Sequence, residues 1–125
     1  MRLKAFDHVN VRTANLKNMV AWYEDVLGLV SGPRPDFPFD GAWLYLGDLA
    51  IVHLVAQAEP AKSIDPQIEH FAISAEGLDG FIKKLGDRGI EPKVNKIESF
   101  GIVQVNVFDP DGNHIHIDFR SEEMA

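Results

Sequence analysis

The sequence has 125 residues, of which 46% are hydrophobic and 25% are charged, a composition that is ordinary for a single globular domain. Its 12 basic residues are scattered and are outnumbered by 19 acidic ones, so the net charge of -7 argues against nucleic acid and against anionic membranes as partners. Cysteine is absent, which excludes disulfides and thiolate chemistry, and neither a signal peptide nor an apolar span of ~20 residues stands out, so we expect a cytoplasmic protein.

The chain opens with a strand and a helix. In residues 6–12 polar and apolar side chains alternate, so a strand would place His8, Asn10 and Arg12 together on one face. Residues 13–28 then change to the three-and-four spacing of an amphipathic helix. The predicted fold therefore begins with a strand that has one polar face, followed directly by a helix.

A proline-rich loop and two strands come next. Residues 31–41 hold three prolines and two phenylalanines, which predicts a long loop that either covers a site or packs back on the core. Residues 42–47 and 49–55 read as strands. Trp43 and Tyr45, if they face inward, could stack on a flat substrate.

The second half repeats this order of elements after a connector that contains two prolines. The predicted elements are a strand over residues 68–74, a helix over 75–89, an edge strand over 91–96, a strand over 102–108 and, after the turn 109–112, a last strand that ends at residue 119.

The last two strands each carry one polar face. Alternation puts His114, His116 and Asp118 on one side of the final strand, and puts Gln104 and Asn106 together on one side of the strand before it. In an ordinary half-buried strand such residues simply face water. One polar face alone is therefore weak evidence for a site, and the same pattern on several strands is stronger evidence.

An internal repeat links these strands. His8 and His70 each belong to the first strand of their half and are 62 positions apart, and His53 and His116 each lie in the last strand and are 63 apart. Self-similarity of this kind is a strong signal of fold. The predicted fold is α+β, a single domain of two βαβββ modules over about residues 1–58 and 67–125, joined by the proline-containing connector.

Three motifs match a known superfamily: His8-Val9 at the first strand, the helix from Asn15-Leu16 through Trp22-Tyr23 to Val26-Leu27-Gly28-Leu29, and the turn Asp109-Pro110-Asp111-Gly112-Asn113. The chain thereby resembles the vicinal oxygen chelate superfamily, which groups glyoxalase I, bleomycin resistance proteins, fosfomycin-inactivating enzymes and extradiol dioxygenases. The resemblance implies curved mixed sheets with metal ligands on the first and last strand of each module. The matching positions are His8, His53, His70 and His116.

The implied ligand set suits a divalent iron, zinc, nickel or manganese ion, of which imidazole favours the first three. Glyoxalase-like members typically carry glutamate at the last-strand positions, and in the dioxygenases one glutamate joins two histidines, so His53 and His116 depart from both patterns. Glu69 precedes a ligand and is expected to point to the opposite face, which leaves no carboxylate base for an isomerase. Four neutral ligands also leave the charge of the ion uncompensated, which an anionic substrate would offset.

These features favour a dioxygenase slightly. The alternatives are a glyoxalase-like isomerase or lyase, a fosfomycin-type transferase, and a non-catalytic binding protein of the bleomycin-resistance kind. In each case the partner is a small molecule, and the resemblance suggests a homodimer, with the site formed within one chain or across two.

Polar and aromatic residues near the implied site could orient a substrate, although each could equally line a cavity or pack at its rim. His114 or Asp118 could hold a ligand histidine through a hydrogen bond. The candidates for substrate contact are Asn10, Arg12, Trp43, Tyr45, Gln104 and Asn106.

Overall fold

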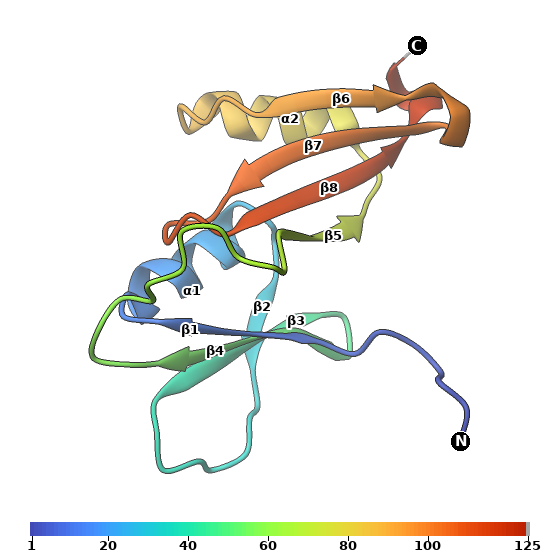
Figure 1. Ribbon diagram of the computed structural model, residues 1–125. Coiled ribbons are helices and arrows are strands. Elements are labelled where there is room, and N and C mark those ends of the chain that lie inside the picture. Colours follow the sequence, from blue (N-terminus) through green and yellow to red (C-terminus); the bar gives the residue numbers. More distant parts are fainter. Residues whose placement is uncertain (125) are drawn as a thin grey trace. The chain divides into compact units, whose positions relative to one another are not determined.

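In the computed structural model, which describes residues 1–124, the chain divides into two units with the same order of elements (Figure 1). The units are Met1–Ser63 and Ile64–Ala125. Each contains one α-helix and one four-stranded mixed sheet. The predicted α+β class with two βαβββ modules is therefore confirmed, and the idea that the modules make a single domain stays a prediction.

The first unit contains a strand that the sequence did not reveal. Its sheet has the order β1-β4-β3-β2, and β1 runs parallel to β4. The three-residue strand β2 and the start of β3 occupy both ends of the predicted loop 31–41, so that loop is shorter than expected. The elements are β1 (Val9–Thr13), α1 (Leu16–Asp25), β2 (Val30–Gly32), β3 (Gly41–Leu46) and β4 (Leu49–Ala56).

The second unit follows the same plan. Its sheet has the order β5-β8-β7-β6, with β5 parallel to β8, and β6 is an edge strand as predicted. The elements are β5 (His70–Ser74), α2 (Leu78–Asp87), β6 (Lys93–Ile97), the short 3-10 helix η1 (Glu98–Phe100), β7 (Ile102–Phe108), β8 (His114–Arg120) and the 3-10 helix η2 (Ser121–Met124).

Burial of one face fixes the register of the second sheet. Alternate residues of β7 and β8 form the apolar core, while the residues between them lie on the other face. A shift of one residue would exchange these faces, so the buried side chains specify the pairing. The core residues of these two strands are Val103, Val105, Val107, Ile115, Ile117 and Phe119.

The turn before β8 is built on a buried aspartate. Asp109 Oδ1 accepts hydrogen bonds from the backbone N–H groups of Asp111 and Asn113, both at 3.0 Å, and its Oδ2 accepts one from Asn113 Nδ2 at 2.8 Å. Gly112 takes a positive φ of 87° within the turn. The predicted turn is confirmed, and it sets where β8 and its histidines begin.

Both α-helices are shorter than predicted, and α2 shows why. Its N-cap, Gly77, has a positive φ of 92° and offers no side chain to the first turn. Glu123 from η2 replaces that cap, because its Oε1 accepts hydrogen bonds from the N–H groups of Gly77 and Leu78, both at 2.9 Å.

With ten residues each, neither α-helix could span a membrane, and no other helix in the described part of the chain has the length and apolarity to do so.

Removing the Glu123 carboxylate should destabilise the protein. Because Glu123→Ala leaves two N–H groups at the start of α2 without their acceptor, we expect the free energy of unfolding to fall by about 1 kcal/mol. Glu122→Ala is the matched control, since that neighbour lies in an exposed ion pair with Arg120 and its loss should change stability by less than about 0.5 kcal/mol. Urea unfolding followed by circular dichroism measures both, and equal effects would contradict the capping role.

Candidate metal centre

Two of the four predicted ligands meet on the second sheet. His70 begins β5 and His116 lies in β8, which is its parallel neighbour. Their ring centroids are 4.2 Å apart, and His116 is only 6% exposed. We call these two residues the second histidine pair.

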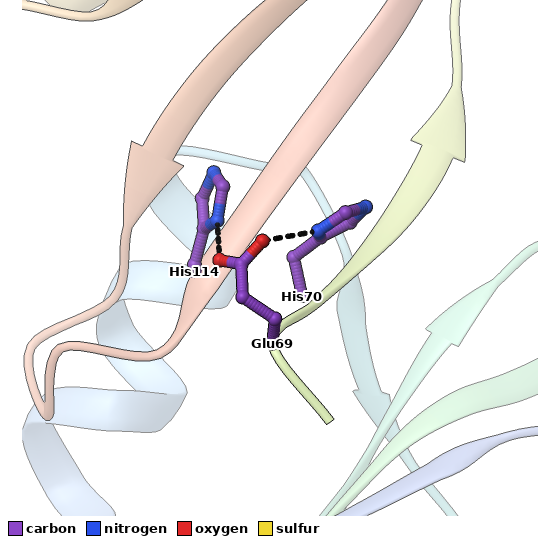
Figure 2. A group of neighbouring side chains, drawn as sticks. All are labelled: Glu69, His70 and His114. Carbon is purple, nitrogen blue, oxygen red and sulfur yellow. Dashed lines mark hydrogen bonds and ion pairs between the residues drawn. The ribbon is translucent and has the colours of Figure 1, made fainter. Parts of the chain in front are cut away.

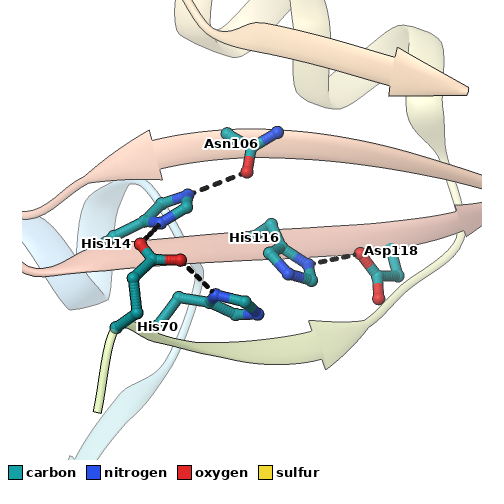
Figure 3. A network of polar contacts seen from close by, with 6 residues as sticks. His70, Asn106, His114, His116 and Asp118 are labelled. Carbon is teal, nitrogen blue, oxygen red and sulfur yellow. Dashed lines mark hydrogen bonds and ion pairs between the residues drawn. The ribbon is translucent and has the colours of Figure 1, made fainter. Parts of the chain in front are cut away.

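A carboxylate holds the same nitrogen of each ring in this pair. His70 Nδ1 donates to Glu69 Oε1 at 2.7 Å (Figure 2), and His116 Nδ1 donates to Asp118 Oδ1 at 2.7 Å (Figure 3). In both rings the proton is thereby fixed on Nδ1 and Nε2 is left with a free lone pair. Asp118 thus has the position that the sequence predicted for a residue that orients a ligand.

Glu69 bridges two histidines, and the prediction that it points away from them is wrong. Its Oε1 accepts from His70, and its Oε2 accepts from His114 Nδ1 at 2.5 Å (Figure 2). Strand alternation does not apply to this residue because β5 begins only at His70. The hydrogen bonds from His114 and then from His70 lower the pKa of the Glu69 carboxyl, so it is a weak base.

The ring of His114 also contacts Asn106, on the side away from Glu69. Its Nε2 lies within hydrogen-bonding distance of Asn106 Oδ1, at 2.8 Å, and Asn106 Nδ2 donates to the carbonyl oxygen of Lys93 at 2.9 Å. This second bond fixes which way the amide of Asn106 points. The amide is committed to the network, and its predicted contact with substrate stays a prediction.

Glu69, His70 and His114 also place possible ligand atoms within 4.8 Å of one another. In the observed arrangement these atoms face each other as hydrogen-bond partners, so a metal ion among them would have to displace both Nδ1 protons. The carboxylate is therefore better placed to support His70 as a ligand through Nε2 than to ligate a metal with it.

The other two predicted ligands, the first histidine pair, meet in the first unit. His8 lies just before β1, and its ring stacks on that of His53 from β4, with centroids 3.7 Å apart. Trp43 from β3 stacks on the opposite face of His53 at 3.9 Å. Burial, and then the charge of His8, lower the pKa of His53, which favours a neutral ring that can offer a lone pair.

Asp7 repeats the role of Glu69. It directly precedes His8 as Glu69 precedes His70, 62 positions later, and its Oδ1 accepts from His8 Nδ1 at 2.6 Å. An acidic residue stands immediately before each first-strand histidine in the sequence, but strand alternation assigns such a residue to the opposite face. His53 differs, because its Nε2 donates to the carbonyl oxygen of Ala50 at 3.0 Å and leaves Nδ1 free.

The remaining predicted substrate residues have different surroundings. Asn10 and Arg12 are exposed on β1, and Gln104 of β7 lies opposite Asp118. The hydroxyl of Tyr45 donates to the carbonyl oxygen of Pro33 at 2.5 Å, so it anchors the proline-rich loop. Their roles toward a substrate stay predictions.

Within each unit, the paired imidazoles offer nitrogen donors that suit a divalent metal ion. Three imidazoles present a free Nε2 while a carboxylate holds Nδ1, which is the usual support of a metal-binding histidine. The fourth presents Nδ1 from a buried ring. Nitrogen donors of this kind favour iron, zinc or nickel over magnesium or calcium.

Comparisons with known proteins agree with this architecture. The family model described as Glyoxalase/Bleomycin resistance protein/Dioxygenase superfamily matches residues 5–117. The chain is 32% identical to the Arabidopsis thaliana protein named Glyoxylase I 4, over 94% of this chain and 71% of that protein.

Solved structures share the fold at lower identity. A glyoxalase family protein from Bacillus anthracis is 22% identical with a TM-score of 0.79, over 96% of this chain and 98% of that one. A structure described as lactoylglutathione lyase from Agrobacterium tumefaciens is 18% identical with a TM-score of 0.72, over 95% and 96% of the two chains.

The lowered pKa of His53 should make stability depend on pH. Its pKa lies below the ordinary 6.5 in the folded protein, so between these two values the unfolded chain binds more protons than the folded one. Stability should therefore rise with pH through this window and fall as pH drops below 6.5. Chelator-treated protein unfolded in urea at several pH values measures the slope, and His53→Gln should make it shallower. An unchanged slope in that variant would contradict this assignment.

Proposed function

The chain belongs to the glyoxalase/bleomycin resistance protein/dioxygenase superfamily, and on this premise we propose that it is a metal-dependent enzyme acting on a small molecule that binds through neighbouring oxygens. The observation that carries the proposal is the carboxylate on Nδ1 of three of the four histidines, which leaves their Nε2 atoms free. A divalent ion held there would polarise and orient a chelated substrate.

The protein's own residues have separable tasks in this proposal. Asp7, Glu69 and Asp118 hold a proton on the Nδ1 atom of a histidine, so that the opposite nitrogen stays unprotonated. Arg12 offers an exposed positive charge to an anionic group. Trp43 offers an aromatic surface for a flat substrate, although one of its faces is covered by His53.

Among the reaction classes, oxygenation remains slightly favoured. An isomerase needs a base that takes a proton from carbon. The carboxylates beside the histidines already accept hydrogen bonds, and Glu69 is further weakened as a base by its lowered pKa. Reaction of a chelated substrate with dioxygen at a redox-active metal does not require such a base.

Isomerisation is the second candidate, and one observation favours it. The chain is 32% identical over most of its length to a protein named Glyoxylase I 4. With the carboxylates engaged, an isomerase would have to use a histidine or a water molecule as its base. A homodimer is part of either version, as the family resemblance implies.

Metal content tests the shared part of the proposal. Protein purified anaerobically without an affinity tag should hold about one equivalent of divalent metal per chain if all four histidines serve one ion. His116→Gln should lose that metal, because it removes the most buried ring of the second pair. Gln104→Ala, on the neighbouring strand opposite Asp118, is the control that should retain it.

The outcome of this measurement is decisive in both directions. Elemental analysis gives the stoichiometry, and light scattering of the same samples gives the mass of the assembly. Absence of metal even after reconstitution with iron, zinc, nickel and manganese would contradict the proposal and leave a binding protein. Metal retained by His116→Gln would contradict its role as a ligand.

Reaction class needs a separate assay. An oxygenase should consume dioxygen with catechols or diketones, whereas an isomerase should exchange a carbon-bound proton of a hydroxycarbonyl compound for deuterium in heavy water. We expect oxygen consumption that is lost on chelation and restored by iron. Deuterium exchange without oxygen consumption would instead support the second candidate.

A further inference from the structure

The two histidine pairs are not supported equally. His114 lies opposite His70 in the sheet of the second unit and contacts its carboxylate partner. The residue 63 positions earlier, at the same repeat offset that separates His53 from His116, is Ile51. An isoleucine side chain has no hydrogen-bonding atom, so the first unit lacks this contact.

We propose that His114 and Asn106 act as positioning residues that fix the tautomer and orientation of His70 through Glu69. The inference rests on the proposed function insofar as His70 is a metal ligand. It goes further by assigning a role to two residues that would not touch the metal, and by making the second histidine pair the better organised of the two.

Glu69 is exposed and needs a second contact to hold its position. Its side chain is 65% exposed and lies outside the strand, so a single bond to His70 would leave a long, mobile side chain to hold the ring. The second bond, from His114 Nδ1 to Oε2, occupies the other carboxylate oxygen. With both oxygens bound, the carboxylate has one orientation in which it can accept from His70 Nδ1.

His114 is anchored on the side of its ring away from Glu69. Its side chain is 19% exposed, and its Nε2 lies 2.8 Å from Asn106 Oδ1. Asn106 is 8% exposed, and its amide is fixed in turn by its bond to the carbonyl oxygen of Lys93. Phe108 stacks on the ring of His114, with centroids 5.0 Å apart. The chain from backbone to His70 therefore runs through groups that have little freedom (Figure 3).

The first unit provides the contrast. Asp7 is 84% exposed, and its described contact is the single bond to His8. The stacking of His8 on His53 restrains the plane of the ring but does not restrain the Asp7 carboxylate that accepts from Nδ1. The carboxylate partner of His70 is bound at both oxygens and that of His8 at one, and the difference comes from the extra histidine, His114.

Two variants of His114 test the inference in the whole protein. His114→Ile gives the second unit the residue that the first unit has, and His114→Gln keeps a polar side chain should the first variant fail to fold. Asp7→Asn is the matched control, since it removes the carboxylate partner of the other pair. In metal-free protein, long-range proton–nitrogen NMR spectra report which ring nitrogen of each histidine carries the proton.

In the wild type, His70 should show a single tautomer with the proton on Nδ1. The His114 variants should convert it to a mixture of tautomers, whereas Asp7→Asn should leave it unchanged. Titration with zinc ions should show about 10- to 100-fold weaker binding in the His114 variants with the same stoichiometry at saturation. This pattern separates a positioning residue from a ligand, whose loss lowers the stoichiometry.

An unchanged His70 tautomer in a folded His114 variant would overturn the inference, whatever the affinity for zinc. So would a mixed tautomer in the wild type. If the wild type binds no zinc, the proposed function fails, but the tautomer of His70 in metal-free protein still decides whether His114 positions it.

Discussion

The burial of one apolar face of each sheet is the constraint on which the candidate site depends. In the second unit, Val105 and Ile117 lie in the core, and the strand period of two then holds His116 and Asp118 on the opposite face. The hydrogen bond between these two polar residues, two positions apart on β8, is a direct consequence of that register. The site is therefore as stable as the core behind it, because slippage of β8 by one residue would expose Ile115, Ile117 and Phe119 and bury the carboxylate of Asp118.

The fold could be predicted from the sequence because the two halves of the chain show the same pattern of strands and helix. The offsets of 62 and 63 between equivalent histidines tie two halves together, and each half supplies the alternation and the helical spacing that define its elements. The exception is β2, whose three residues are too few to show a period and lie next to prolines. A strand of this length is recognised only through its pairing with β3, which is a tertiary property.

The candidate site was predictable in part, and the limits have physical causes. Side-chain alternation brought His70 and His116 together but failed for Glu69, since a residue outside the strand obeys no such rule. The stack of His53 between His8 and Trp43 depends on how three strands align, and the pairing of β3 with β4 shifts register at Leu44 and Tyr45. No local pattern encodes such a shift.

The carboxylates beside the histidines reduce the positive charge that a substrate would have to balance. Considered alone, four neutral imidazoles leave a divalent charge that an anionic substrate would have to balance. Asp7, Glu69 and Asp118 each accept a hydrogen bond from Nδ1 of one of these histidines. Their negative charges therefore lie beyond the rings, on the side away from Nε2. If the histidines hold a divalent ion as proposed, these carboxylates would raise the basicity of the imidazoles and offset part of the charge of the ion through them. A neutral carbonyl compound would then be as acceptable a substrate as an enolate or a catecholate, and residues outside the ligand set, such as Arg12, would choose between them.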